Sequence, residues 1–549
     1  MNRMSVVESI RSFREEVDPV PFVVGALVTF AFLGYTVLDT EGAAAAIDAA
    51  FVTFGEGLAW LYLGSVLLLV VAAGYLLVGR YGSVRLGDSD PEYGTVSYVA
   101  MFFSAGLSAG IVFFGPVEAL LHYQTVPPLF ADSVAAESSA AAVPAVAYTV
   151  FHYGISAWAG YLAIGLPVAY FAYRHDAPFR VSTALYPILG PDRLDGVIGR
   201  TVDILAVVAT LGGIATGLGF IASQLLTGVT YRTGVTFADS EVIAVIVGIT
   251  VLFTLSLVAG VRRGIRRLSL FNVGIMTLLL SVALIAGPTT AVLNTAVASI
   301  GTYVTSFFEM SLFTGSGVEG GAGWSAAWTV FYWSWWIAWA PFVGLFLARI
   351  SKGRTIRSVI GTAFGTMTVV SAVWFTVIGG TSIRLQDSGA VDVLGAVSTF
   401  DDGVSGYVLF GAFPGGELWQ LLFLILVTTF FLTSADSSTL AVGMLTTGGK
   451  RDPSGVNRVF WGVLQGAIAS VLVVVGGATA LRSSVIVTGA PFAVVCLVAM
   501  GGFLRWLVRH PTPDPGADTD TRSTRDGGST ERSDPTGDGS TPRVVAEDD

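Results

Sequence analysis

The residues Phe331-Tyr332-Trp333-Ser334-Trp335-Trp336-Ile337-Ala338-Trp339 form the most distinctive stretch of this sequence, and they bear directly on its fold class. They lie inside an apolar run, residues 325–348, that contains no charged side chain. About 20 helical residues cross the roughly 30 Å of hydrocarbon in a bilayer. The run therefore predicts a membrane-spanning helix, and its aromatic side chains are candidates for a binding site.

The composition of the whole chain extends this prediction. Of its 549 residues 53% are hydrophobic and 12% are charged, whereas a soluble domain carries about 25% charged residues. The chain is predicted to be an all-α polytopic membrane protein with twelve transmembrane helices. The apolar runs are 20–38, 58–78, 98–122, 143–173, 203–229, 241–261, 269–286, 325–348, 357–379, 417–445, 457–478 and 485–508.

The distribution of basic residues predicts the orientation, because cytoplasmic loops collect Lys and Arg. With the N-terminus inside, the inner loops receive the clusters 262–267 and 349–357, together with most other basic residues. The outer loops receive only Arg232, Arg384 and Arg482. Twelve spans then place both termini in the cytoplasm, in a multi-pass protein of the cell membrane. Residues 1–19 form a cytoplasmic segment without the small-residue cleavage site of a signal peptide.

Two segments do not span the membrane. The loop 287–324 has no basic residue and contains an amphipathic stretch, 291–308, which is predicted to lie along the outer face. The tail 511–549 is acidic, rich in Ser, Thr, Gly and Pro, and almost free of large apolar residues. Such a composition predicts disorder, because too little apolar surface is available to offset the chain entropy.

Enzymatic and nucleic-acid-binding functions have no support in the sequence. The four histidines, His122, His152, His175 and His510, show no ligand spacing of a metalloenzyme. His152 is interpreted as a packing residue. The single cysteine, Cys496, excludes an intramolecular disulfide bond. The basic clusters flank apolar runs, so they orient spans and do not form a nucleic-acid interface. The chain is therefore predicted not to be an enzyme and to bind no nucleic acid.

Two spans contain residues that interrupt helices. The third has three glycines and a proline between Met101 and Pro116, and the eighth has Pro341 followed by Gly344. Interrupted helices at corresponding positions of two halves indicate an inverted repeat with a binding site between them. The predicted repeats are 98–286 and 325–510, preceded by two peripheral helices in 20–97. The alternative for the glycines of the third span is close helix packing.

Aromatic residues of the eighth span share one helical stripe with i, i+3, i+4, i+7 spacing. They are Tyr332, Trp335, Trp336 and Trp339. Trp336 precedes Arg349 by thirteen residues, which is about 20 Å of helix. This depth argues against an interfacial aromatic belt. A second cluster in the fourth span comprises Tyr153, Trp158 and Tyr161. The alternative is that some of these rings only fill space.

A cage of aromatic rings is suited to a quaternary ammonium group. A desolvated cation above a ring gains about 0.5–2 kcal/mol, and the methyl groups require apolar walls. No acidic residue accompanies the eighth-span stripe. The predicted substrate is therefore a zwitterion, whose own carboxylate balances its charge.

The tenth span carries five hydroxyl side chains and one acid between Phe430 and Thr439. Sodium prefers oxygen ligands, as the alkaline-earth ions do. Hydroxyls of this span and carbonyl groups freed by the interrupted third span predict a sodium site. The alternative is that the hydroxyls donate to the carbonyl four residues earlier.

Residues 332–344 and 348–357 closely resemble the signature of the betaine/choline/carnitine transporter family. The resemblance extends over roughly residues 15–510 and includes the glycine-rich third span and Thr433-Ser434-Ala435-Asp436-Ser437. It implies a LeuT-like fold, a 5+5 inverted repeat with two extra N-terminal helices. It also implies a homotrimer that moves compatible solutes by alternating access.

The resemblance also assigns roles to particular residues. The family's aromatic box falls on Tyr153, Trp158, Tyr161 and Trp336, with Trp339 adjoining it on the substrate path. One sodium site maps to Ser104, Leu107, Phe430, Thr433 and Ser434. A second maps to Thr210, Ile214 and Phe342, but the side chain of Ile214 cannot bind an ion. Choline-selective members have an aspartate where this chain has Gly110, which favours a betaine-type substrate.

The function predicted from these observations is secondary active import of a glycine betaine-like solute, coupled to sodium. Two alternatives stay open: sodium-independent exchange of carnitine or betaine-type substrates, and choline uptake. Besides the solute, the predicted partners are membrane lipid and two further copies of the chain. Members of the family that sense osmotic stress use a basic helical tail, and this property does not carry over to the acidic tail here.

Overall fold

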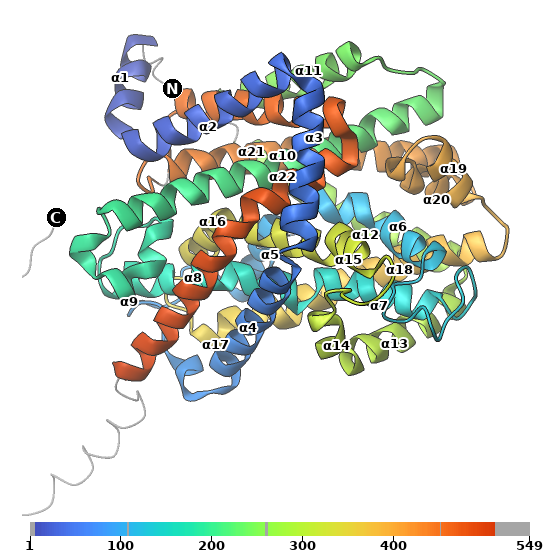
Figure 1. Ribbon diagram of the computed structural model, residues 1–549, viewed down its shortest axis with the longest axis horizontal. Helices are drawn as coiled ribbons and strands as arrows, with labels where there is room; N and C mark the ends of the chain where they lie inside the picture. Colours follow the sequence, from blue (N-terminus) through green and yellow to red (C-terminus); the bar gives the residue numbers. More distant parts are fainter. Residues whose placement is uncertain (1–5, 107–108, 259–261, 451, 511–549) are drawn as a thin grey trace, which may run out of the picture. The chain divides into compact units, whose positions relative to one another are not determined.

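A computed structural model describes residues 6–106, 109–258, 262–450 and 452–510 (Figure 1). Within these ranges the chain is helical and contains no strand beyond the isolated bridge between Arg85 and Thr355. Residues 1–506 form one compact unit, and a second unit comprises Leu507–Asp549. Leu107, which was predicted to bind sodium, and the acidic tail 511–549 lie outside the described residues.

The helices of the first half follow the predicted runs. Asp18 caps the first spanning helix by accepting a hydrogen bond from the amide of Val20 at 3.4 Å. The principal helices are α1 (Val6–Glu16), α2 (Pro19–Leu38), α3 (Thr40–Ala50), α4 (Ala59–Val78), α5 (Thr95–Gly106), α6 (Ala109–Gln124), α7 (Ala142–Tyr153), α8 (Ile155–Arg174), α10 (Val197–Thr233), α11 (Asp239–Val258) and α12 (Arg262–Ala286). The predicted third span thus consists of α5 and α6, and Gly154 divides the fourth into α7 and α8.

The second half begins after the loop helices. These are α13 (Thr289–Thr305), which covers the predicted amphipathic stretch, and α14 (Phe307–Leu312). The remaining helices are α15 (Gly321–Ser325), α16 (Phe331–Ile350), α17 (Ile356–Gly361), α18 (Thr368–Asp387), α19 (Val393–Thr399), α20 (Ser405–Gly411), α21 (Gly416–Leu445) and α22 (Gly455–Arg509). Gly477, with a φ of 52°, interrupts α22 near the end of the predicted run 457–478.

The predicted break at Pro341 is wrong, because α16 continues through this residue to Ile350. A proline lacks the N–H that would bond to the carbonyl four residues earlier, so the carbonyl of Ile337 has no donor from Pro341. Transmembrane helices tolerate such a proline where neighbouring helices surround it. The irregular part of the eighth span lies earlier, in the π-helical segment Ala326–Val330.

The membrane-spanning character is clear from length and composition. Among the described residues eight helices are long and apolar enough to cross a membrane, and a ninth is formed if the bent pair Leu270–Ala286 and Thr289–Thr305 counts as one span. The chain is therefore an all-helical, multi-pass membrane protein. The number twelve and the inverted repeat stay predictions.

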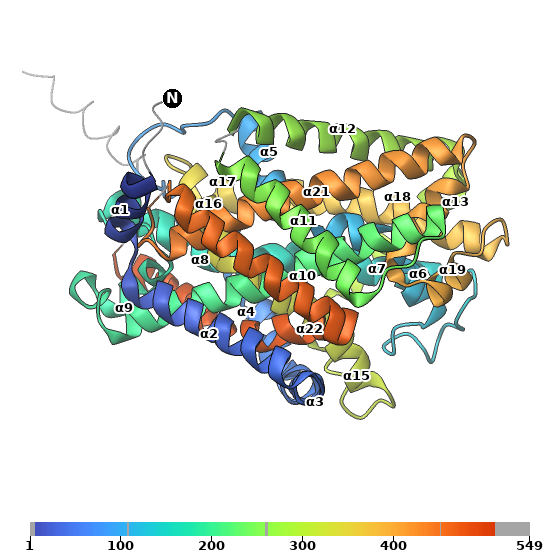
Figure 2. The same ribbon diagram turned by 90° about the horizontal axis from the view of Figure 1, so that it is seen from above.

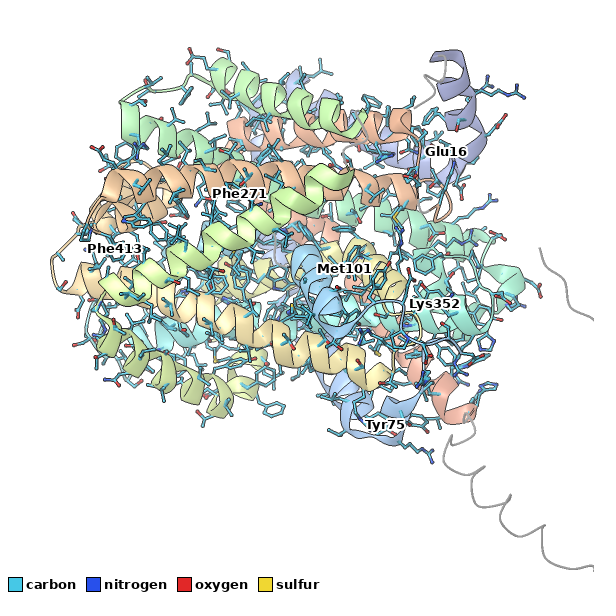
Figure 3. All side chains as sticks on the ribbon, turned by 180° about the vertical axis from the view of Figure 1, so that it is seen from behind. Glu16, Tyr75, Met101, Phe271, Lys352 and Phe413 are labelled. Carbon is cyan, nitrogen blue, oxygen red and sulfur yellow. The ribbon has the colours of Figure 1, made fainter. Side chains whose placement is uncertain are left out.

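Burial separates inner from outer helices. In the apolar windows of Gly321–Ile350 and Ala142–Arg174, 94% and 89% of the residues are buried, against 28% in Pro19–Leu38. Outer helices present half-exposed apolar side chains, such as Tyr75 and Phe271 (Figure 3). This pattern is expected where the surrounding medium is lipid.

The helices α8 and α16 pack against each other in the interior, and glycines allow their backbones to approach. A Cβ atom on Gly165 would lie 3.0 Å from the carbonyl oxygen of Gly344. The helices α12 and α21 lie side by side (Figure 2), with the hydroxyl of Thr429 donating to Oδ1 of Asn272 at 2.6 Å. The aromatic side chains of the predicted site belong to the interior helices α7, α8 and α16.

Candidate substrate-binding site

Trp336 of α16 lies at the centre of a cluster of aromatic rings. Its ring centroid is 5.3 Å from that of Tyr153 in α7 and 6.4 Å from that of Tyr161 in α8, both edge to face. Trp335 stacks on it at 5.5 Å with an interplanar angle of 5°. Trp158 stands edge to face with Tyr161 at 5.5 Å. The structure thus brings together, from three helices, the rings that the sequence predicted for the box.

The rings are buried and held by polar contacts to the backbone. Trp336 is 5% exposed, and its indole N–H donates to the carbonyl of His152 at 2.9 Å. The indole N–H of Trp335 donates to the carbonyl of Gly213 in α10 at 3.0 Å. These two bonds fix the orientation of both tryptophans relative to α7 and α10.

Three other donors in or beside the box have no hydrogen-bond partner among the described residues. They are Nε1 of Trp158, the hydroxyl of Tyr161 and Nε1 of Trp339, and all three residues are at least 93% buried. A buried polar group without a partner costs about 1–3 kcal/mol. Such groups in a native structure call for a partner that is not part of the chain. A ligand with acceptor oxygens would satisfy them.

Gly110 of α6 lies directly against the cluster. A Cβ atom at this position would be 3.0 Å from the hydroxyl oxygen of Tyr153 and 3.1 Å from Cη2 of Trp335. These distances are tighter than ordinary van der Waals contacts. Any side chain at position 110 therefore occupies space at the edge of the box, which is where the family resemblance placed a determinant of selectivity.

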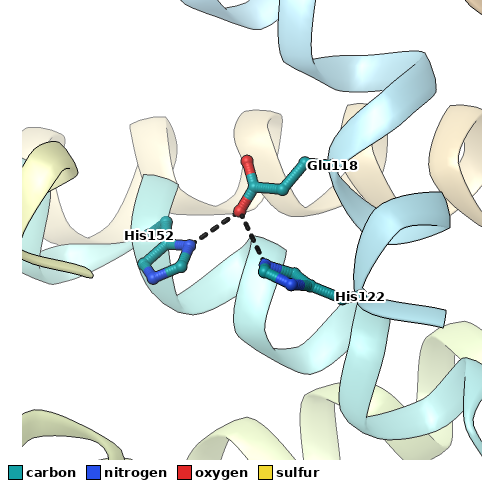
Figure 4. A group of neighbouring side chains, drawn as sticks. All are labelled: Glu118, His122 and His152. Atoms are coloured by element: carbon teal, nitrogen blue, oxygen red, sulfur yellow. Dashed lines mark hydrogen bonds and ion pairs between the residues drawn. The ribbon is translucent and has the colours of Figure 1, made fainter. Parts of the chain in front are cut away.

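An acidic residue does accompany the eighth-span stripe, contrary to the sequence analysis. Glu118 of α6 is fully buried, and its Oε2 accepts a hydrogen bond from the hydroxyl of Tyr332. Its Oε1 lies 2.7 Å from Nδ1 of His152 and 3.5 Å from Nε2 of His122 (Figure 4). The prediction failed because Glu118 comes from another span.

The histidines of this group were also missed as functional candidates. Glu118 and His122 have the i, i+4 spacing that places them on one face of α6, and this signal was available in the sequence. His152 reaches them from α7 only through tertiary packing. Its Nε2 lies 3.1 Å from the hydroxyl of Thr329, and its ring stacks on Tyr332 at 4.6 Å.

The predicted sodium ligands are described only in part. Leu107 and the side chains of Ser104 and Ser434 lie outside the described residues. The hydroxyl of Thr433 donates within α21, to the carbonyls of Thr429 at 3.2 Å and Phe430 at 3.1 Å. For Thr433 the structure therefore shows the bond to the carbonyl four residues earlier that the sequence analysis gave as the alternative to an ion site. The lone pairs of the hydroxyl oxygen are still available to a cation. Sodium binding at these residues stays a prediction.

The residues of the doubtful second sodium site belong to α10 and α16. Thr210 is buried, and its hydroxyl has no hydrogen-bond partner among the described residues. Ile214 lies one turn later on α10 and is also buried. Phe342 packs against Trp339, with ring centroids 6.1 Å apart. None of these contacts supplies an oxygen in place of Ile214.

Comparison with known proteins identifies the family of the chain. The family described as "BCCT, betaine/carnitine/choline family transporter" matches residues 20–512. A glycine betaine transporter of Bacillus subtilis is 38% identical over 466 residues, which cover 84% of this chain and 88% of the relative. An ectoine/hydroxyectoine transporter of Virgibacillus pantothenticus is 34% identical over 494 residues, covering 88% and 96%. An uncharacterized transporter of Mycobacterium tuberculosis is 38% identical over 501 residues, covering 90% and 83%. These relatives are named as transporters and not as enzymes, and the chain belongs to the betaine/carnitine/choline transporter family.

Proposed function

We propose that the chain imports a zwitterionic quaternary-ammonium solute of the glycine betaine type, by alternating access and coupled to sodium. Membership of the family and the name of the relative from Bacillus subtilis support this class of substrate. The homotrimer expected from the family resemblance is part of the same proposal.

The observation that carries the proposal is the pairing of aromatic rings with unpartnered donors. Tyr153, Tyr161 and Trp336 bring three aromatic rings together, and the faces of such rings attract an ammonium group. The indole N–H groups of Trp158 and Trp339 have no partner in the described chain, and neither does the hydroxyl of Tyr161. A zwitterion needs both kinds of surface, because its ammonium group prefers rings and its carboxylate needs hydrogen-bond donors.

Sodium coupling rests on the family resemblance of the predicted ion site. Backbone carbonyl groups of the glycine-rich third span are expected ligands, and residues 107–108 of this span lie outside the described residues. The hydroxyl of Thr433 in α21 donates within its own helix, as the alternative without sodium also expects, and its lone pairs stay available to a cation. One sodium ion per solute is better supported than two, because Ile214 replaces an oxygen ligand of the second site.

Choline uptake is the second candidate, and one observation favours it. The bond between Tyr332 and Glu118 places a carboxylate beside the stripe, and choline has no carboxylate of its own. However, Glu118 is fully buried, and its two oxygens already contact the hydroxyl of Tyr332 and Nδ1 of His152. A carboxyl group that is engaged within the chain in this way is a poor counter-ion for choline, which leaves the zwitterion as the favoured substrate.

Transport into proteoliposomes tests the proposal. With an inward sodium gradient we expect accumulation of radiolabelled glycine betaine, and we expect little accumulation when potassium replaces sodium. A tenfold excess of unlabelled choline should reduce this uptake much less than unlabelled betaine does. Uptake that is unaffected by the replacement of sodium would contradict symport and favour exchange.

A variant of the ion site separates the two parts of the proposal. Thr433→Val removes the hydroxyl but keeps the shape of the side chain. We expect the sodium concentration for half-maximal uptake to rise at least tenfold, while betaine binding at saturating sodium is retained. Unchanged sodium dependence in this variant would remove Thr433 from the site.

A further inference from the structure

The buried group Glu118, His122 and His152 has the composition of a transition-metal site. Each residue offers one ligand atom, and these atoms all lie within 4.8 Å of one another (Figure 4). One carboxylate oxygen and two imidazole nitrogens are a common ligand set for divalent ions such as Zn²⁺. We propose that these three residues bind a divalent transition-metal ion and that its binding weakens the binding of betaine to the adjacent box.

The distances are close to those that a metal requires. Metal–nitrogen and metal–oxygen bonds of about 2.1 Å place the ligand atoms of a tetrahedral site about 3.4 Å apart. Oε1 of Glu118 lies 2.7 Å from Nδ1 of His152 and 3.5 Å from Nε2 of His122. Small side-chain movements would therefore bring these atoms to coordination distance.

His122 supplies an independent indication of a ligand. The residue is 1% exposed, and its Nε2 has no hydrogen-bond partner among the described residues. Its ring is held among other rings, 4.5 Å from Trp328 and 5.4 Å from Trp324. The packing thus directs this nitrogen toward Glu118 at an ion-pair distance of 3.5 Å, and a metal would provide the closer partner that it lacks.

His152 can bind a metal and still keep its hydrogen bond to Thr329, in the π-helical segment Ala326–Val330 that precedes α16. With Nδ1 donating to Glu118, its Nε2 accepts from the hydroxyl of Thr329 at 3.1 Å. When a metal takes the lone pair of Nδ1, the ring proton resides on Nε2 and is donated to the same hydroxyl, which can accept as well as donate. Such a partner on the second nitrogen orients a metal-binding histidine.

The charges around the group limit its affinity. Arg482 acts electrostatically on both Glu118 and His122, and its guanidinium carbon lies 5.0 Å from the ring centroid of Trp328. A divalent ion must therefore bind beside a fixed positive charge in a medium of low dielectric constant. We accordingly expect weaker binding than at a structural zinc site.

The connection to betaine rests on the proposed function and on two contacts. The carbonyl of His152 accepts the indole N–H of Trp336 at 2.9 Å, and the hydroxyl of Tyr332 donates to Glu118. Tyr332 also stacks on Trp336 at 6.0 Å. A metal that draws Glu118 and His152 toward itself shifts both contacts, and with them the central ring of the box.

Cobalt titration of the full-length protein tests the site. The protein is purified in detergent through an affinity tag without histidine, and Co²⁺ is added while the visible ligand-field absorption is recorded. We expect a saturable band that Zn²⁺ removes. His122→Phe keeps an aromatic ring in the same packing and should weaken Co²⁺ binding at least tenfold, whereas His175→Phe, a matched change outside the group, should not.

Two results would overturn the metal site: no saturable band in the wild-type protein, or equal Co²⁺ binding in the wild-type and His122→Phe proteins. Should His122→Phe fail to elute as the wild type does in size-exclusion chromatography, Glu118→Gln replaces it. This variant removes the charged ligand with little change of shape, and the same tenfold loss is expected.

Betaine binding, followed by tryptophan fluorescence, tests the connection. We expect Zn²⁺ to lower the betaine affinity several-fold in the wild type and to have no effect in His122→Phe. Unchanged betaine affinity in the presence of bound metal would overturn the connection and leave the metal site standing. Absence of betaine binding in every sample would instead contradict the proposed function, and the cobalt result would stand.

Discussion

Two glycines at the edge of the aromatic box have little free space around them. A Cβ atom on Gly110 would lie 3.0 Å from the hydroxyl of Tyr153, and one on Gly213 would lie 2.5 Å from Cδ1 of Trp339. An added Cβ atom at Gly213 would force the ring of Trp339 to move, whereas at Gly110 a small shift of the neighbouring rings would make room for it. The effect of position 110 on selectivity, which the family resemblance indicates, stays a prediction.

Trp336 is the residue whose replacement should affect binding most. Trp336→Ala removes a ring that contacts Tyr153, Tyr161 and Trp335. A lost cation–ring contact of about 0.5–2 kcal/mol, together with the loss of ring packing, should lower betaine affinity at least tenfold. Trp336→Phe keeps a ring but loses the bond to His152 and should retain part of the affinity. Fluorescence titration of the purified variants measures both.

Size-exclusion chromatography shows whether a variant has lost only the aromatic cage or also the fold. Both variants should elute in size-exclusion chromatography as the wild type does. Equal loss of betaine affinity in Trp336→Ala and Trp336→Phe would count against an aromatic cage for the ammonium group.

At the scale of elements, the approach of α8 and α16 positions the box. Gly165 and Gly344 face one another, and a Cβ atom on Gly344 would lie 2.8 Å from the Cβ atom of Ile164. Association of helices in lipid depends on this kind of close packing between small residues. Gly344, which the sequence analysis took as part of an interrupted helix, therefore has a packing role.

Gly344→Ala should separate the two helices slightly and destabilise the protein. Overpacking of this kind costs about 1–3 kcal/mol, and we expect a lower thermal midpoint in detergent together with weaker betaine binding. Gly74→Ala in α4 is the matched control, because no heavy atom lies within 4 Å of its added Cβ. Equal thermal midpoints of the two variants would show that the helices do not depend on this contact.

At the scale of the whole molecule, basic residues from separate predicted inner loops meet. Nε of Arg174 donates to the carbonyl of Arg85 at 2.7 Å, and Nε of Arg357 donates to the carbonyl of Leu77 at 2.8 Å. Loops that contact one another must lie on the same side of the membrane. The contacts agree with the grouping from the positive-inside rule, and the side that faces the cytoplasm stays a prediction.

Cysteine labelling tests the orientation. On a Cys496→Ala background, Ser388→Cys should react with a membrane-impermeant maleimide in intact cells, because its loop is predicted to be outside. Ser89→Cys should react only after permeabilisation. Both positions are exposed, so failure to label would not result from burial. The reverse pattern would invert the predicted topology.

Some features of this protein were predictable from its sequence, and others were not. The helical class and the multi-pass membrane character were predictable, because long apolar runs have few alternatives in a bilayer. The break at Pro341 was wrongly predicted, since local propensity does not show that α8 and α10 surround α16. The rings of the box in the fourth and the eighth span were predicted from helical spacing and from the family resemblance. The distances between these rings are set by helix packing and are known only from the structure.

The sequence by itself determined that this protein lies in a membrane, that it belongs to a transporter family, and that one face of its eighth span is aromatic. The membrane location and the aromatic face follow from composition and periodicity, which are local, and the family follows from the resemblance of residues 332–344 and 348–357 to its signature. Only the tertiary structure decided that Glu118 and His122 of α6 meet His152 of α7 and Tyr332 of α16. The physical reason is that side chains on different helices become neighbours through packing, and no spacing along one chain segment encodes that contact.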